Sequence, residues 1–167
     1  HGFDRGFDLF DELFADPELW DQGVAGEHLA PRLQEWIATV GDEAFLAWAH
    51  LFEPHAPYDA PADLQGEFVQ PYEGPVAGDR RWIDSYRFSE VEVDASGWRH
   101  LQELYTARLA LADRHLGSLL AVLERSGRAG QTVVVITSDH GEAFGEHGLI
   151  EHGDTVHGEE LEVPLVL

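Results

Sequence analysis

Histidine and acidic side chains gather near the C-terminal end of this sequence. Four of the ten histidines fall between residues 140 and 157, and Asp139 stands directly before the first of them. Carboxylate and imidazole are both ligands for divalent cations, and a turn at Gly141 would let Asp139 and His140 face one ion. The pair therefore predicts a metal site. The alternative is a loop carboxylate that caps the next helix beside a solvated histidine.

The other histidines of this group are His147, His152 and His157. An imidazole beside a metal-bound anion can contact the anion or donate a proton to a leaving group. We expect such a role for at least one of the three. The alternative is that the acidic loops of this chain simply carry histidine.

A second histidine segment spans residues 50–58, where His55 lies between Pro54 and Pro57. Proline restricts both its own backbone and that of the preceding residue, so His55 is held on a stiff loop that suits a substrate contact. A stiffened turn with exposed histidines is the alternative. No nucleophile stands out, since the chain has no cysteine, no P-loop and no Gly-x-Ser-x-Gly motif.

The elements that must position these residues follow from hydrophobic spacing. Apolar runs at 45–49 and 132–137 predict buried strands, and a further strand begins at Val163. Spacings of three and four predict helices over 29–40 and 97–126. Residues 53–96 form a long connection rich in proline and glycine, and residues 139–162 are loop-like.

Caps and topology complete this prediction. We expect Ser96 to cap the long helix at its start and Gly127 at its end. Strand, helix and strand in that order predict an α/β fold with a mainly parallel sheet. Because ligands bind at the carboxyl ends of parallel strands, His55 and the Asp139-His140 pair should line one site.

Composition limits the classes of protein. The chain has 167 residues and a net charge of −22, and all ten basic residues are arginine. This acidity argues against nucleic-acid binding, and no apolar stretch is long enough to span a membrane. The length suits one domain without a second. Because the chain lacks methionine and stops within an apolar run, we expect it to be part of a larger protein.

Five segments together resemble the sulfatase family of the alkaline phosphatase-like superfamily. They are residues 2–8; residues 45–58; the helix positions Tyr105, Ala107, Asp113, Leu116, Gly117 and Leu120; residues 137–142 with 145–148; and residues 152–153 with 159–165. The matches occur in family order over nearly the whole chain. The resemblance implies an α/β/α sandwich of which residues 1–167 form the middle to C-terminal part of the catalytic core.

The resemblance also implies an activity and site roles. It implies hydrolysis of sulfate esters with one divalent cation, usually Ca²⁺, although Mg²⁺, Mn²⁺ or Zn²⁺ would fit. Asp139 and His140 match metal ligands, His55 matches the sulfate contact, and His152 matches a His or Lys position beside the substrate. The formylglycine nucleophile belongs to an N-terminal motif before this segment, so the chain alone should be inactive.

Two other functions stay open at this stage. A phosphodiesterase, phosphonate monoester hydrolase or phosphotransferase of the same superfamily would share the Asp-His-Gly element. A non-catalytic module that binds a metal or a partner protein would explain the missing nucleophile. The compartment and the oligomeric state are not indicated by the sequence.

Overall fold

A computed structural model describes residues 2, 4–13, 25–88 and 91–167, so Phe3 of the 2–8 segment lies outside it. The longer helices are α2 (Ala25–Val40), α3 (Ala62–Phe68), α4 (Arg80–Phe88) and α5 (Ala95–Arg125). The C-terminal elements are η2 (Ala129–Gln131), β1 (Ile136–Thr137), β2 (Ala143–Phe144), η3 (Glu146–Gly148), β3 (Ile150–Glu151), α6 (Gly158–Leu161) and β4 (Leu165–Val166).

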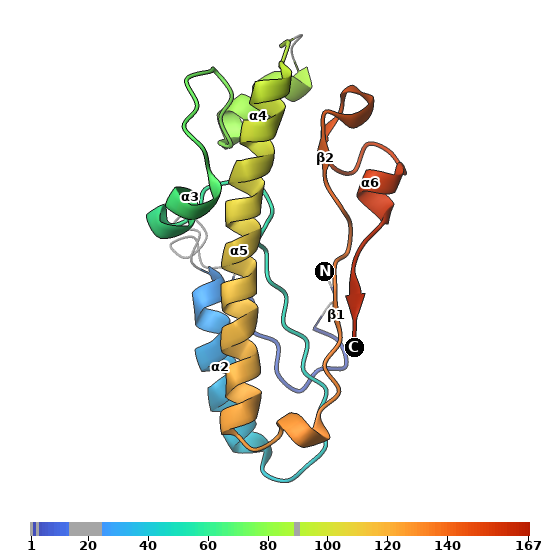
Figure 1. The fold of residues 1–167 in the computed structure, drawn as a ribbon. Coiled ribbons are helices and arrows are strands. Elements are labelled where there is room, and N and C mark those ends of the chain that lie inside the picture. Colours follow the sequence, from blue (N-terminus) through green and yellow to red (C-terminus); the bar gives the residue numbers. More distant parts are fainter. Residues whose placement is uncertain (1, 3, 14–24, 89–90) are drawn as a thin grey trace.

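Helix α5 runs along the long dimension of the molecule and organises the other elements. In Figure 1, α2 and α3 lie on one side of it, and the segments with β1, β2 and α6 lie on the other. None of the helices in the described ranges has the length and apolar character that a bilayer crossing requires.

The ends of α5 follow ordinary capping chemistry. The expected N-cap Ser96 is wrong: Asp94 is the cap, and its carboxylate accepts a hydrogen bond from the Gly97 amide at 2.8 Å. A carboxylate there satisfies a free amide and suits the helix dipole. At the other end Gly127 has φ +71°, and the Arg128 amide donates to the Leu123 carbonyl at 3.1 Å, which is a Schellman stop.

The main core cluster joins segments that are distant in sequence. It contains Ala56 and Tyr58 from the histidine loop (residues 50–58), Val76, Ile83 of α4, Leu101 of α5 and Ile150 of β3. Ile83 and Leu101 are fully buried, and burial of each such side chain stabilises the fold by about 1.5–3 kcal/mol. A second cluster packs Leu64 of α3 against α5. These contacts hold the histidine loop against the C-terminal segments.

The expected parallel sheet is not found among the described residues. β1 pairs with β4 and β2 pairs with β3, and both ladders are antiparallel. Residues 45–49 are not assigned to a strand, and the run at 132–137 is a strand only at its end. Trp48 is 78% exposed and Val133 is 82% exposed. An apolar run records a preference for burial, whereas strand pairing depends on which backbone lies beside it.

A buried polar pair lies where α2, α5 and the histidine loop meet. His115 of α5 and Glu53 are both buried, with Nδ1 3.6 Å from Oε1. Gly26 of α2 approaches so closely that a Cβ there would overlap the His115 ring. Burial lowers the pKa of His115; Glu53 and Glu27 oppose this shift, while Arg108 and Arg114 add to it.

The close approach of Gly26 to His115 predicts that a larger residue at position 26 destabilises the fold. Gly26→Ala should lower the free energy of unfolding by about 1–3 kcal/mol, because the new methyl group must displace a buried ring. Gly117→Ala is the matched control, since a Cβ at that position would meet no neighbouring atom within 4 Å and alanine favours the helix by roughly 0.5–1 kcal/mol. Denaturant unfolding of both variants measures the difference. Equal stability of Gly26→Ala and the parent would contradict this packing.

The lowered pKa of His115 predicts a pH dependence. Below pH 6.5 the unfolded chain protonates this histidine more readily than the folded chain does, so stability should fall as the pH drops through that value. His115→Leu should flatten the loss between pH 7.5 and 5.5, as measured by urea unfolding at several pH values. An unchanged slope in His115→Leu would show that other groups carry this dependence.

Candidate functional site

Three histidines from three separate segments come together in the structure. The rings of His140 and His152 stack with centroids 3.6 Å apart, and the His55 ring meets His152 edge-on at 5.3 Å. His55 and His140 are 85 positions apart in the sequence. The structure therefore brings His55 and His140 together through the ring of His152, although no parallel sheet edge joins them among the described residues.

The orientation of two rings is set by nearby backbone carbonyls. His55 Nδ1 lies 2.7 Å from the Ala56 carbonyl oxygen, and His140 Nδ1 lies 2.8 Å from that of Gly141. A carbonyl only accepts, so Nδ1 carries the hydrogen in both rings. The Nε2 atom then presents a lone pair in the neutral ring, or a donor in the protonated ring.

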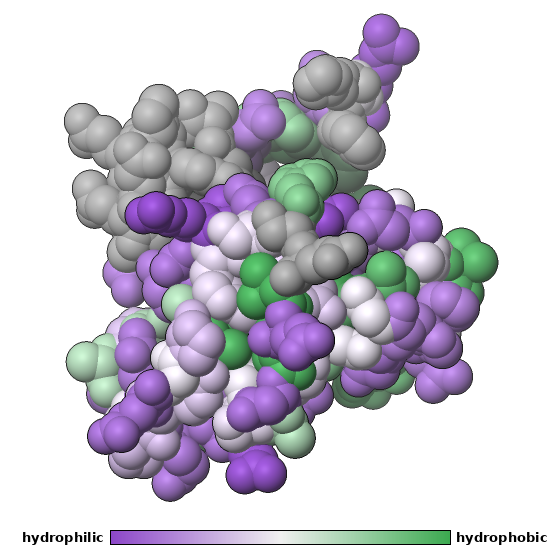
Figure 2. All heavy atoms as spheres, turned by 90° about the horizontal axis from the view of Figure 1, so that it is seen from above, coloured by the Kyte–Doolittle hydropathy of each residue, from purple (hydrophilic) through white to green (hydrophobic). Residues whose placement is uncertain are grey.

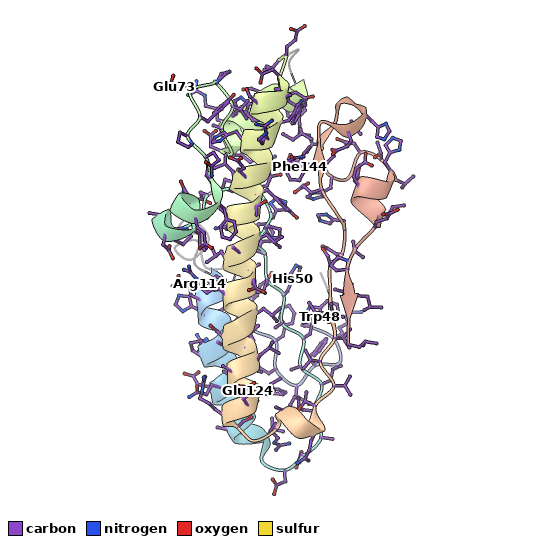
Figure 3. All side chains as sticks on the ribbon, in the orientation of Figure 1. Trp48, His50, Glu73, Arg114, Glu124 and Phe144 are labelled. Atoms are coloured by element: carbon purple, nitrogen blue, oxygen red, sulfur yellow. The ribbon has the colours of Figure 1, made fainter. Side chains whose placement is uncertain are left out.

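The histidine loop is held in place by aromatic packing. The Phe52 ring stacks on His55 at 4.5 Å. Tyr58 is 1% exposed, and it packs against Tyr105 of α5 at 5.6 Å and near Phe144 of β2 at 6.0 Å. Burial raises the pKa of Tyr58, with the Glu142 and Glu151 carboxylates adding to the shift, so its phenol stays neutral. In Figure 3 Phe144 and His50 lie on the side of α5 that faces β1 and β2.

Asp139 and His140 converge as metal ligands would. His140 Nε2 lies 3.7 Å from Asp139 Oδ1, and the Asp139 side chain is largely exposed. One hard oxygen donor and one imidazole suit a divalent cation. In the described part of the chain, no group of three or more such residues could hold a metal. The pair therefore fits a cation as part of a larger ligand set.

Gly141 allows the backbone after His140 to approach α6 closely. Its amide donates to the Glu160 carbonyl at 2.8 Å, and a Cβ at this position would overlap the Glu159 carbonyl. Any larger residue would push the segment after Asp139 away from α6. The glycine is thus needed for the close approach of this segment to α6.

Glu142 is a site residue to which sequence reasoning assigned no role. Its carboxylate lies 2.9 Å from His152 Nδ1, and its side chain is only 6% exposed. A carboxylate accepts, so Nδ1 donates and Nε2 is directed elsewhere. Its place two residues after His140 is the one signal that could have suggested it.

His147 and His157 form a separate pair. Their rings stack at 3.9 Å, and His147 Nε2 lies 3.4 Å from Glu159 Oε1. Neither has a ring contact with His55, His140 or His152 among the contacts described. Of the three histidines considered for the substrate, only His152 joins the cluster with His55 and His140.

The chain matches the model of a known protein family along its whole length. The family model for Sulfatase covers residues 1–167. The chain is 27% identical over 142 residues to iduronate 2-sulfatase of Homo sapiens, which covers 71% of this chain and 25% of that protein. It is 29% identical over 137 residues to the uncharacterized sulfatase YidJ of Escherichia coli (strain K12), with coverage of 75% and 27%.

A further relative has a broader name. The chain is 30% identical over 79 residues to the multifunctional alkaline phosphatase superfamily protein PehA of Trinickia caryophylli, with coverage of 47% and 15%. The matches to iduronate 2-sulfatase and YidJ span about a quarter of the length of those relatives.

The incomplete donor set predicts weak metal binding. Purified as 167 residues, the chain should bind Ca²⁺ with a Kd of about 10⁻⁴ M or weaker, because few ligands and an exposed carboxylate give low affinity. Isothermal titration calorimetry measures this, with Asp139→Asn as the control. Tight, saturable binding that Asp139→Asn abolishes would mean that more donors converge than the described residues provide.

Proposed function

This chain belongs to the sulfatase family, and from that premise we propose that the protein hydrolyses sulfate esters with His55, His140, His152 and Asp139 in its active site. The observation that carries the proposal is the gathering of the three histidine rings, two of which stack at 3.6 Å. The chain then supplies one wall of the site, with the formylglycine nucleophile outside it. The whole protein would be the enzyme, and the chain alone inactive.

The proposed reaction transfers a sulfuryl group. The oxygen of the nucleophile forms a bond to sulfur, and the bond from sulfur to the ester oxygen breaks. His55 in its protonated form donates Nε2–H to a non-bridging sulfuryl oxygen. His152 in its protonated form, held through Nδ1 by Glu142, donates its Nε2 proton to the departing oxygen, so the alcohol leaves neutral and the ring keeps the hydrogen on Nδ1.

A divalent cation, Ca²⁺ before Mg²⁺, Mn²⁺ or Zn²⁺, would be held by Asp139 and His140 with further donors, and it would draw negative charge from the sulfuryl oxygens. The chain's own part is to orient those two ligands. The carbonyl of Gly141 fixes the His140 ring through Nδ1, which leaves Nε2 to coordinate.

The overall charge makes local positive charge necessary. A net charge of −22 repels an anionic ester at long range. Figure 2 shows a largely hydrophilic surface on the end of the molecule seen from above, with hydrophobic patches among it. Histidines that can carry a proton, with the cation, would supply the attraction at short range.

The α/β/α sandwich is part of this proposal. Trp48, Val133 and Leu165 are all largely exposed, although their sequence patterns are those of buried strands. Pairing of these runs within a mainly parallel, alkaline phosphatase-like sheet of the whole protein would cover them. Their exposure supports the idea that this chain is one part of that core.

A second activity has an observation in its favour. The similarity to PehA, named a multifunctional alkaline phosphatase superfamily protein, fits a phosphodiesterase, phosphonate monoester hydrolase or phosphotransferase. The same histidines and cation would then stabilise a phosphoryl group. A non-catalytic module that binds a metal or partner is the remaining alternative.

Substrate tests separate these functions. At its natural full length, the protein should hydrolyse 4-nitrophenyl sulfate faster than bis(4-nitrophenyl) phosphate or a phosphonate monoester. His55→Ala should lower kcat/KM by about 10²–10⁴-fold, since it removes a group that contacts the reacting sulfate. His157→Ala is the matched control and should retain activity, because its ring stacks on His147 outside the cluster.

The other outcomes decide between the alternatives. Faster hydrolysis of the phosphorus esters would replace the sulfatase assignment with the phosphodiesterase or phosphonate hydrolase one. Hydrolysis of none of these esters would favour the non-catalytic module. Full activity of His55→Ala would remove His55 from the proposed site.

A further inference from the structure

The residue before His152 is a buried carboxylate held by two arginines of α4. Glu151 is 3% exposed. Arg80 donates two hydrogen bonds to it, from Nη1 to Oε1 at 2.6 Å and from Nη2 to Oε2 at 2.8 Å. Arg87 adds a third, from Nη1 to Oε2 at 2.9 Å.

Paired guanidinium groups explain how this carboxylate can be buried. A charge taken out of water is costly unless it is paired and hydrogen-bonded. Burial by itself raises the pKa of Glu151, but the hydrogen bonds from Arg80 and Arg87 outweigh it and lower the pKa below its ordinary value. Glu151 therefore stays charged and depends on both arginines.

The same contacts hold a strained backbone in place. Glu151 has φ +64°, a left-handed conformation that residues other than glycine rarely adopt. Such a conformation persists only where surrounding contacts determine it. Loss of the arginines would leave the backbone next to His152 free to relax.

Contacts on the other side of His152 complete the restraint. Arg87 Nη2 donates to Asp154 Oδ2 at 2.7 Å, so one arginine bridges carboxylates on both sides of the histidine. The buried Glu160 accepts from the Gly153 amide at 2.9 Å and from the Thr155 hydroxyl. The turn that carries His152 is thus tied to α4 and to α6.

Arg80 and Arg87 lie on the same face of α4. Arg80 and Arg87 are seven residues apart, which is two helical turns, so they project from the same side. Ile83 lies between them and is fully buried in the main core. The core thus fixes α4, and α4 in turn fixes Glu151.

We propose that Arg80 and Arg87 are positioning residues for His152, acting through Glu151 and Asp154 to hold its ring against His140 and in reach of the departing oxygen. This inference rests on the proposed function for the role of His152. Its geometric part, the dependence of the ring position on α4, can be tested without activity.

The kinetic test compares two leaving groups in the full-length protein. Arg80→Leu should lower kcat/KM for phenyl sulfate about tenfold more than for 4-nitrophenyl sulfate, because a poor leaving group needs the proton more. Arg87→Leu should do the same. A merely structural role would lower both rates equally and leave their ratio unchanged. The control is Arg81→Leu, at an exposed position of the same helix. It should leave both rates and their ratio unchanged.

Two structural measurements accompany the kinetics. Hydrogen exchange of the peptide covering residues 151–155 should become about tenfold faster in Arg80→Leu, and a crystal structure should show the His152 ring displaced from His140. If Arg80→Leu does not fold, Arg87→Lys and Asp154→Asn serve instead, because both retain the two hydrogen bonds from Arg80 to Glu151. Each should change the leaving-group ratio and the exchange rate in the same direction by a smaller amount.

The outcomes separate this inference from the proposed function. If the parent protein hydrolyses no ester, the proposed function fails, and the exchange and ring position alone decide the positioning role. An unchanged leaving-group ratio, or unchanged exchange with the His152 ring in place in a folded Arg80→Leu, would overturn the inference.

Discussion

Burial of one face of α5 is the constraint on which the rest of the structure depends. Leu101 and Ala107 of this helix are fully buried. The first packs with the histidine loop, α4 and β3, and the second with α3. Each contact removes apolar surface from water, which is the main favourable contribution to folding. The helix therefore holds the segments that carry His55 and His152 so that their rings meet.

Several of the described arginines hold distant segments of the chain together. Arg108 is buried and donates to the Asp59 carbonyl at 2.8 Å. Arg114 pairs with Asp63, and Arg80 and Arg87 bind Glu151. The planar guanidinium group suits such multiple contacts between segments. In a chain with a charge of −22, these pairs engage cations that could otherwise attract an anionic substrate.

Some elements were predictable because their pattern is long. The helix over 97–126 has many apolar positions at helical spacing, and α5 matches it closely. Helix α4 was not predicted, since its nine residues combine Trp82, Ile83 and Tyr86 with arginines in a region rich in proline and glycine. Short helices of this kind depend on tertiary packing more than on local preference. The sequence pattern therefore did not indicate that Arg80 and Arg87 act together on Glu151.

The sequence by itself determined the residue types that can do the chemistry and the long helix between them. The family resemblance had already singled out His152, but only the tertiary structure decided that its ring contacts those of His55 and His140, that Glu142 orients it and that α4 anchors its turn. It also decided the antiparallel pairing of β1 with β4. Side-chain chemistry and periodicity are local properties of the chain, whereas proximity and strand partners depend on how distant segments pack.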